Sequence, residues 1–294
     1  MNSSPRSSEY QSIIDEDLEY IKSKGKLYKY ISPSSGILML ENLGIKFNIP
    51  KNFNDPFDCD PSLIATSNRY NIELLKSILN NPPRDLTKQV KEAIQKVVDE
   101  GDFNNSPYYA GFKETSGLDL RRQLLVNTKI TCFSEENDNM LMWSHYTRNK
   151  NHEDHTGICV EFQVEPFLTS MVKVLSTMGL EGQFLKVKYD EKRINYIVDS
   201  AKDLSPMMMW FKTKSICWAY EKEIRFVLPK WVEDLGKSIL PISKEVISAV
   251  YLGVNISLDD EIRIKELCEQ KLPFTKLFKM QLSENHYALW PKEI

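Results

Sequence analysis

The chain has 294 residues, of which 41% are hydrophobic and 27% are charged, and its formal net charge at pH 7 is −3. This composition is that of a globular protein with one large domain or two small ones. The lack of net positive charge excludes a protein that binds nucleic acid non-specifically through its overall charge. No apolar run approaches the length of a membrane span, and the first residues lack the apolar segment of a signal peptide. We therefore expect a cytoplasmic protein that does not contact a membrane.

The first segment, residues 1–26, is expected to form a polar tail followed by a short helix, because apolar residues recur at helical spacing in its second half. Residues 27–294 are expected to form a single α+β domain. This domain opens with a strand at 27–31, where aromatic residues alternate with other types. A helix then begins near Pro33, and we expect Gly44 to end it.

Residues 70–125 differ in character from the segments on either side. Two apolar stripes at helical spacing, at 74–79 and 86–97, predict two helices. A polar, aromatic and irregular stretch follows them. We expect a helical insertion between strand-rich parts of the domain, which serves either as a lid or as a packing element.

Strand character returns after the insertion, and the later helices are grouped rather than alternating regularly with strands. No glycine-rich phosphate-binding loop follows any strand. This order favours an α+β fold with a mixed, largely antiparallel sheet at its core. The expected strands lie at 130–134, 157–162, 184–189, 220–229, 247–254 and 274–282, and the expected helices lie at 139–146, 205–211 and 257–270.

The most informative segment is the acidic strand expected at 220–229. Strand alternation places Glu221, Glu223 and Arg225 on one face. Two carboxylates on one face repel each other, and their pKa values move apart unless cations intervene. Such a pair at the start of a strand can stabilise a positive charge that develops during a reaction. The alternative is an edge strand whose two glutamates are solvated beside Arg225.

Two further groups of residues can either build a site or be structural. Asn54 and Asp55 lie in a loop rich in turn-forming residues, which can form a wall facing a substrate or simply be a rigid loop. Trp143 and Tyr146 are three residues apart and share a face of the expected helix. An aromatic pair of this kind either belongs to the core or stacks on a flat ring of a ligand.

Metal binding has two candidate places in the sequence. His145 and residues 152–155 bring three histidines and two carboxylates close together, but their irregular spacing across a helix end and a polar loop favours a solvated loop. A metal-dependent nuclease is the other possibility. We expect no bound metal, and the carboxylates that such a nuclease would use are Asp55, Asp58, Glu221 and Glu223.

Six segments match one family in their order and spacing. They are Leu27–Tyr30, Phe53–Asp58, Cys132–Glu135, Leu141–Tyr146, Gly157–Phe162 and Tyr220–Arg225. Together they resemble the bacterial domain of unknown function 2971 family, over most of the chain from about Lys26 to Val254. The family label implies no chemistry.

Lys29 lies in the first expected strand, Ser134 ends a later strand, Tyr146 lies in the helix that follows it, and Glu221 and Glu223 open the acidic strand. In this order the residues resemble, more distantly, the three motifs of the ADP-ribosyltransferase superfamily. Lys29 stands in place of the histidine that holds the NAD ribose in that superfamily. Tyr146 matches the tyrosine that stacks on nicotinamide, and Glu223 matches the glutamate of the third motif.

The resemblance implies an ADP-ribosyltransferase-like fold and an NAD-consuming enzyme, either a bacterial toxin or an antiphage defence effector. Glu223 would stabilise the oxocarbenium-like transition state, Glu221 would orient or deprotonate the acceptor, and Tyr146 would stack on nicotinamide. NAD is then a substrate, and the acceptor is water, a protein or a nucleic acid. The residues expected to contact NAD are Lys29, Tyr30, Asn54, Asp55, Ser134, Trp143 and Arg225.

A second hypothesis comes from another class of protein. Under it, the chain is a catalytically silent module that binds a ligand in the same cleft and signals through a partner protein of a defence system. Glu223→Gln would abolish NAD turnover under the enzyme hypothesis and would spare ligand binding under this one. The nuclease hypothesis predicts instead an activity that depends on added divalent metal.

Overall fold

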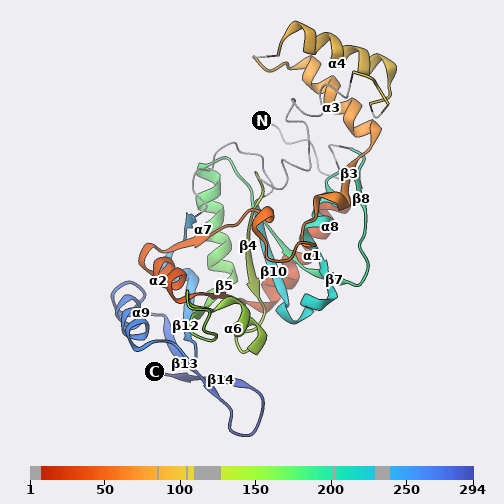
Figure 1. The fold of residues 1–294 in the computed structure, drawn as a ribbon. Helices are drawn as coiled ribbons and strands as arrows, with labels where there is room; N and C mark the ends of the chain where they lie inside the picture. Colours follow the sequence, from red (N-terminus) through yellow and green to blue (C-terminus); the bar gives the residue numbers. More distant parts are fainter. Residues whose placement is uncertain (1–7, 85, 104, 109–126, 201–202, 229–238) are drawn as a thin grey trace.

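A computed structural model describes residues 8–84, 86–103, 105–108, 127–200, 203–228 and 239–294. Within them, an eight-stranded sheet of order β14-β13-β12-β5-β1-β4-β10-β6 forms the centre of the molecule (Figure 1). Neighbouring strands pair antiparallel except β12 and β13, which are parallel. The predicted α+β class with a mixed, largely antiparallel sheet is therefore confirmed. The strands are β1 (Lys26–Ile31), β4 (Lys129–Ser134), β5 (Ile158–Gln163), β6 (Gln183–Lys186), β10 (Glu223–Leu228), β12 (Ile247–Leu252), β13 (Lys276–Leu282) and β14 (Leu289–Glu293).

Helices and short strand pairs surround this sheet. The α-helices are α1 (Ser8–Lys24), α2 (Pro33–Asn42), α3 (Asn68–Asn80), α4 (Lys88–Glu100), α6 (Met140–Tyr146), α7 (Val164–Thr177), α8 (Ser205–Lys212) and α9 (Leu258–Lys271). The short pairs are β2 (Gly44–Lys46) with β11 (Ile239–Pro241), β3 (Ile64–Thr66) with β8 (Tyr196–Val198), and β7 (Lys188–Asp190) with β9 (Thr213–Ser215). The 3-10 helices are η1 (Pro50–Asn52), η2 (Pro61–Leu63), η3 (Ile216–Glu221) and η4 (Lys244–Val246). None of these helices combines the length and the apolar composition that a membrane span requires.

One face of the sheet holds the main core, beneath α2, α7 and α9. Its centre is aromatic, since Phe167 of α7 lies edge-on to Phe133, Phe162 and Phe226 with ring centroids 5.3 to 6.0 Å apart. Edge-to-face contacts of this kind add to the stabilisation that comes from apolar burial. This face therefore gives the sheet a rigid support.

The opposite face carries two separate apolar clusters. At the β6 end, Trp210 and Phe211 of α8 pack with Val227 of β10, and α1 adds its buried residues near Tyr10. Toward β12 and β13, Trp143 of α6 packs against strand residues of β1 and β5. Polar and charged side chains of β4 and β10 lie between these clusters. The candidate site is found in this polar strip.

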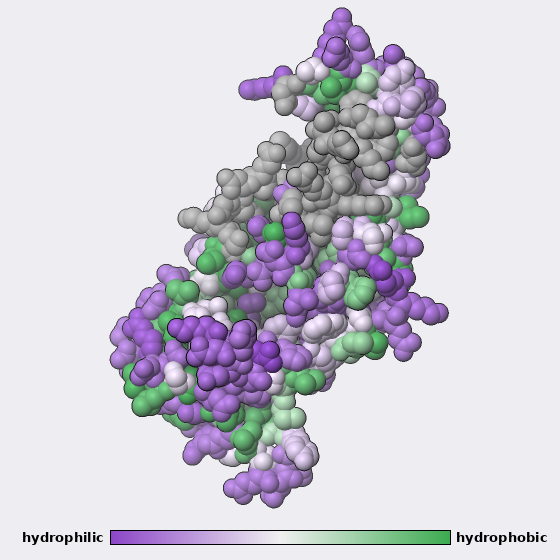
Figure 2. All heavy atoms as spheres, viewed as in Figure 1, coloured by the Kyte–Doolittle hydropathy of each residue, from purple (hydrophilic) through white to green (hydrophobic). Residues whose placement is uncertain are grey.

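Helices α3 and α4 lie side by side and project away from the sheet (Figure 1). They share a small core of their own, formed by Leu75, Ile94, Val97 and Phe103. Hydrophilic side chains cover most of the visible outer surface of this pair (Figure 2). The two helices of the expected insertion are thus present, while its residues 109–125 lie outside the described part of the chain.

The predicted end of the helix after β1 is off by one residue. Leu43, not Gly44, takes the left-handed conformation that closes α2, with φ of 44° and its N–H bonded to the carbonyl of Met39. Gly44 begins β2 instead. A side chain at Gly44 would place its Cβ only 2.7 Å from Ile239 of β11, so this glycine is needed for strand packing rather than for the helix end.

The aromatic core yields the first prediction. Phe167→Ala should lower the free energy of unfolding by about 3–5 kcal/mol, because it removes a buried ring and leaves a cavity. Urea unfolding followed by circular dichroism measures this change. Phe274→Ala is the matched control, since Phe274 is 91% exposed, and it should change stability by no more than about 0.5 kcal/mol. Similar losses in both variants would contradict the assignment of Phe167 to the core.

Candidate active site

A cavity of about 1120 Å³ opens where β1 and β4 separate. The two strands pair only at Tyr28 and Ser134. Further along β4, Asn48 takes the place of β1 and exchanges two backbone hydrogen bonds of 2.8 Å with Ile130. The sheet is therefore split between these points, and side chains from both of its faces line the cavity.

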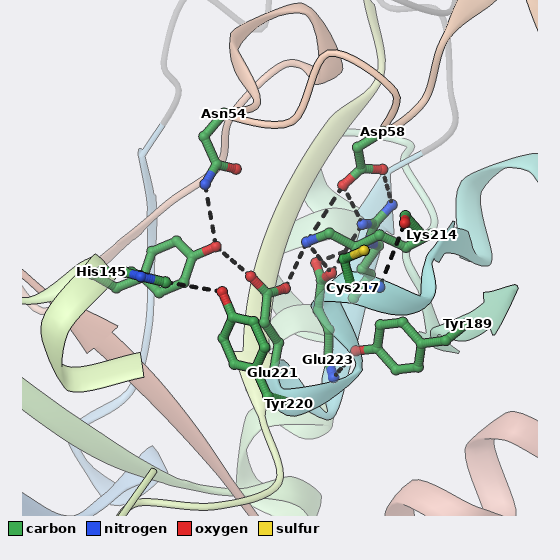
Figure 3. Close-up of polar contacts among 12 residues, drawn as sticks. Asn54, Asp58, His145, Tyr189, Lys214, Cys217, Tyr220, Glu221 and Glu223 are labelled. Carbon is green, nitrogen blue, oxygen red and sulfur yellow. Dashed lines mark hydrogen bonds and ion pairs between the residues drawn. The ribbon is translucent and has the colours of Figure 1, made fainter. Parts of the chain in front are cut away.

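Five charged side chains form a buried network beside the cavity: Asp58, Lys214, Glu221 and Glu223, which Figure 3 labels, and Arg225. Lys214 Nζ lies 2.5 Å from Glu221 Oε2, 3.1 Å from Glu223 Oε2 and 3.7 Å from Asp58 Oδ2. Arg225 binds both Glu223 and Asp58 through paired contacts of 2.6 to 2.9 Å. All five residues are at most 7% exposed. Bidentate contacts and mutual pairing offset the desolvation that such burial imposes on charges.

The acidic segment that supplies two of these carboxylates is not one continuous strand. Glu221 ends η3, Lys222 has φ of 45°, and β10 begins only at Glu223. The predicted strand start at residue 220 is wrong, because Ser215 accepts the N–H of Cys217 and so caps a 3-10 helix there. The left-handed turn still brings both glutamates to the same cation.

The edge-strand alternative for this segment is also wrong. β10 lies between β4 and β6 and is paired on both sides. Glu223 and Arg225 are buried and bonded to each other rather than solvated. The charge pattern is therefore part of an interior site.

The two glutamates differ in their affinity for a proton. For Glu223, burial opposes ionisation, but the charges of Arg225 and Lys214 outweigh it and lower its pKa below the ordinary value. For Glu221, burial outweighs the attraction of Lys214, and repulsion by Glu223 adds to it, so its pKa is raised. One carboxylate thus stays ionised while its neighbour takes up a proton more readily, which is the arrangement of an acid–base pair.

Aromatic side chains surround Glu221 (Figure 3). The Tyr146 hydroxyl donates a short hydrogen bond to Glu221 Oε1, and Asn54 Nδ2 lies 3.4 Å from the same hydroxyl. Burial, together with the charge of Glu221, raises the pKa of Tyr146, so this phenol remains a donor. Next to it, His145 Nδ1 lies 2.9 Å from the hydroxyl of Tyr220, whose pKa burial raises to about 12.

Lys29 reaches the cavity from the other face of the sheet. Its Nζ donates to Thr131 Oγ1 and to the carbonyl of Cys132, both at 2.9 Å. The second bond gives a partner to a backbone carbonyl of β4 at a position where β1 no longer pairs with β4. Burial lowers the pKa of Lys29, Cys132 and the charge of Glu223 oppose this shift, and repulsion by Lys46 adds to it. Neither Lys29 nor Lys46, which also lines the cavity, lies within ion-pair distance of a described carboxylate. The cavity is therefore basic on one side and acidic on the other.

Most of the predicted site residues meet in this cavity, although they come from separate elements. Those that line it are Lys29, Tyr30, Asn54, Ser134, Tyr146, Glu221 and Glu223. Trp143 is fully buried instead and donates its indole N–H to the carbonyl of Asn137 at 2.8 Å. Asp55 accepts the N–H of Phe57 within its own loop, and Arg225 lies behind Glu223 in the charge network.

Two of the charged residues that line the cavity were not predicted, namely Lys214 and Lys46. Lys214 lies in a strand of only three residues, which is too short to show a period. The one available signal is its place in a mostly apolar stretch that begins at Met207, because a lysine in such a stretch needs a buried partner. Lys46 carries no comparable signal.

The expected carboxylate set of a nuclease does not form a free metal site. In the part of the chain that the structure describes, no group of three or more His, Cys, Asp or Glu side chains is arranged to hold a metal ion. Lys214 and Arg225 already occupy the oxygens of Asp58 and Glu223. In the histidine-rich loop, His155 pairs with Ser144 at 3.0 Å.

Comparison with known proteins gives a family match for the central part of the chain. The model of the family described as "Protein of unknown function (DUF2971)" matches residues 142–226. This segment runs from α6 into β10 and includes Tyr146, Lys214, Glu221 and Glu223. The match supports the resemblance to that family. No curated protein and no solved structure matches the chain.

The charge network yields the second prediction. Arg225→Leu would leave Asp58 and Glu223 buried with Lys214 as their shared cation, and it should lower the free energy of unfolding by about 3–5 kcal/mol at pH 7. Because the folded-state pKa of Glu223 is lowered, its pairing with Arg225 stabilises the protein above the ordinary glutamate pKa. This contribution is lost as the pH falls through the lowered pKa. The deficit of the variant should therefore stay constant from pH 7 down to the ordinary glutamate pKa of 4.5 and shrink at lower pH.

Urea unfolding at several pH values between 7 and about 3, which extends well below the ordinary glutamate pKa, measures this deficit. The matched control is Arg193→Leu, since Arg193 pairs with Asp60 at the surface and its side chain is 51% exposed. This control should cost about 0–1 kcal/mol throughout. A deficit in Arg225→Leu that does not change with pH would contradict the assigned role of its carboxylate partners.

Proposed function

We propose that the cavity binds NAD and that the protein is an NAD-consuming enzyme of the ADP-ribosyltransferase type. The observation that carries this proposal is the polarity of the cavity. Lys29 and Lys46, beyond ion-pair distance of any described carboxylate, mark one side, and Glu221 and Glu223 mark the other. A complementary ligand carries phosphates at one end and a cationic group at the other. NAD has both, in its pyrophosphate and its positively charged nicotinamide riboside.

The shape and lining of the cavity also suit a dinucleotide. Its volume of about 1120 Å³ lies slightly above the usual range for ligand pockets, roughly 300–1,000 Å³, and so leaves room for a large ligand. Tyr28, Tyr30, Phe53 and Tyr146 contribute aromatic surface to its wall. Flat rings such as adenine and nicotinamide stack favourably on such side chains.

In the proposed reaction, the bond between the ribose carbon and the nicotinamide nitrogen breaks. Its electron pair moves to the nicotinamide, which leaves as a neutral molecule. The ribose becomes an oxocarbenium-like cation, which the charge of ionised Glu223 would stabilise. Glu221 would accept the proton of the attacking nucleophile, since its raised pKa suits a proton acceptor. Lys29 and Asn54 would hold the phosphates and the ribose.

The nucleophile decides which reaction results. With water, the products are nicotinamide and free ADP-ribose, and the protein is an NAD glycohydrolase. With a protein side chain or a nucleic-acid base, ADP-ribose is transferred to that macromolecule. Either outcome is the chemistry of a bacterial toxin or an antiphage effector.

One observation favours the binding-module hypothesis as a second candidate. Each carboxylate oxygen of Glu221 and Glu223 already accepts a hydrogen bond from Tyr146, Lys214 or Arg225. A network that is satisfied in this way can hold a ligand cavity open without taking part in a reaction. Under this hypothesis, a bound nucleotide would be sensed by a partner protein of a defence system.

The third prediction concerns turnover. Purified protein incubated with NAD should release nicotinamide, which chromatography quantifies. Glu223→Gln and Glu221→Gln keep the side-chain shape but remove the charge, and each should lower the rate by about 100-fold or more. Glu269→Gln, on the exposed side of α9, is the control and should retain the native rate.

Labelled NAD then shows whether ADP-ribose ends on water or on a macromolecule. Turnover that survives both glutamine substitutions would contradict the roles of Glu221 and Glu223. No release with or without cell extract, combined with nucleotide binding that survives Glu223→Gln, would favour the binding module. A nuclease activity that requires added divalent metal would favour the third hypothesis.

The fourth prediction concerns the basic side of the cavity. Lys46→Glu reverses a charge that lines the cavity and forms no ion pair with a described carboxylate, so it should raise KM for NAD by about tenfold, equivalent to ~1.4 kcal/mol, and change kcat little. Steady-state kinetics at fixed ionic strength measures both constants. Lys76→Glu makes the same charge change on the exposed surface of α3, away from the cavity. Equal KM values in the two variants would show that Lys46 does not face the phosphates.

A further inference from the structure

Lys214 contacts both glutamates of the candidate site and is only 5% exposed. We infer that Lys214 is a positioning residue, which fixes the carboxylate of Glu221 against Tyr146 and favours the ionised form of Glu221. Its catalytic meaning rests on the proposed function. The structural part of the inference is independent of that function, because it follows from the contacts of Lys214 with the two glutamates.

The two buried cations of the network share Glu223 and Asp58 as partners but differ at Glu221. Arg225 pairs with Glu223 and Asp58. Within the described residues, Lys214 alone forms an ion pair with Glu221. Arg225 and Lys214 together keep Glu223 ionised, whereas the state of Glu221 depends on Lys214.

The ammonium group of Lys214 is held in place from several directions. Its strand β9 pairs in parallel with β7, where Tyr189 lies opposite Lys214. The hydroxyl of Tyr189 accepts the backbone N–H of Glu223 at 2.8 Å, so the same strand pair fixes the lysine and the start of β10. The Lys214 Nζ also lies 4.9 Å from the ring centroid of Trp218, which adds a cation–π contact. Few other positions remain for this side chain.

Lys214 also opposes the forces that neutralise Glu221. The groups that face Glu221 are Lys214, Tyr146, Glu223, Tyr220, Tyr189 and, through Lys214, Asp58. Lys214 is the cation in this set. Without it, burial and repulsion by Glu223 would act on Glu221 with only the Tyr146 hydrogen bond against them, and the pKa of Glu221 would be higher still.

Lys214 itself keeps its charge in this environment. Burial opposes the ammonium form, but Glu223, Asp58 and Glu221 outweigh it and raise the pKa of Lys214. Lys214 therefore remains a cation beside Glu221. The role differs from that of a residue that itself transfers a proton.

Lys214→Met tests the inference because it keeps the length of the side chain and removes the charge. The titration of Glu221 is followed through its carboxyl carbon in protein labelled with ¹³C-glutamate, with Glu221→Gln to assign the signal. We expect the midpoint to rise by about one pH unit or more in Lys214→Met. The acid limb of the pH profile for nicotinamide release should move up with it, and a purely structural role would not produce such a shift.

Two further variants serve as controls. Lys214→Arg restores the charge and should return the midpoint and the pH profile toward the native values. Lys212→Met removes a lysine two residues away, which pairs with the largely buried Asp17, and it should leave both measurements unchanged. If Lys214→Met does not fold, the double variant Asp58→Asn with Lys214→Gln removes one charge of each sign. It should show the same rise in the Glu221 midpoint.

An unchanged Glu221 midpoint in the folded variants would overturn the inference, whether or not the protein consumes NAD. A rise of the midpoint that Lys212→Met reproduces would overturn it as well, because the effect would then not be specific to this lysine. A native protein that releases no nicotinamide contradicts the proposed function instead. In that case, the titration alone decides whether Lys214 controls Glu221.

Discussion

The burial of three carboxylates side by side is the constraint on which the rest of the site depends. Without opposite charges, desolvation and mutual repulsion would protonate them or keep the segments that carry them apart. Arg225 and Lys214 remove this penalty, and they do so from two different strands. The loop with Asp58 and the 3-10 helix with Glu221 must therefore dock on the sheet together. The network thus links the docking of distant segments to the formation of one wall of the cavity.

The opposite wall depends on an interruption in the sheet. A strand that loses its neighbour exposes backbone groups that need new partners. At the split between β1 and β4, Lys29 and the segment around Asn48 supply these partners. The sheet can then open without exposing unpaired backbone at these positions. Because Lys29 serves this purpose on the face opposite to Glu223, the gap lets a single ligand meet basic and acidic groups that strand alternation would otherwise separate.

The strands and helices with a clear period could be read from the sequence, and the partners across the site could not. β1, β4 and β5 follow their predicted ranges closely because alternation or an apolar run marks each of them. Helix α7 was not predicted, although Phe167, Met171 and Leu175 have helical spacing. Its Pro166 lies in the first helical turn, where proline is tolerated. Lys214 was beyond prediction because its partners are set by tertiary packing. Glu221 was correctly predicted to lie near Glu223, but the reason was wrong. The left-handed turn at Lys222, and not strand alternation, brings the two side chains together.

The contacts that stabilise Glu221 and Glu223 also suit these two carboxylates to different roles in the proposed reaction. Glu223 has both oxygens bound to cations, so a substrate hydroxyl would have to displace a charged donor to reach it. Its charge still acts over several ångströms in a buried site, where the effective dielectric constant is low. Glu221 accepts one of its bonds from the neutral hydroxyl of Tyr146, which a substrate can replace more easily than an ion pair. A role in proton transfer therefore suits Glu221, and a fixed negative charge suits Glu223.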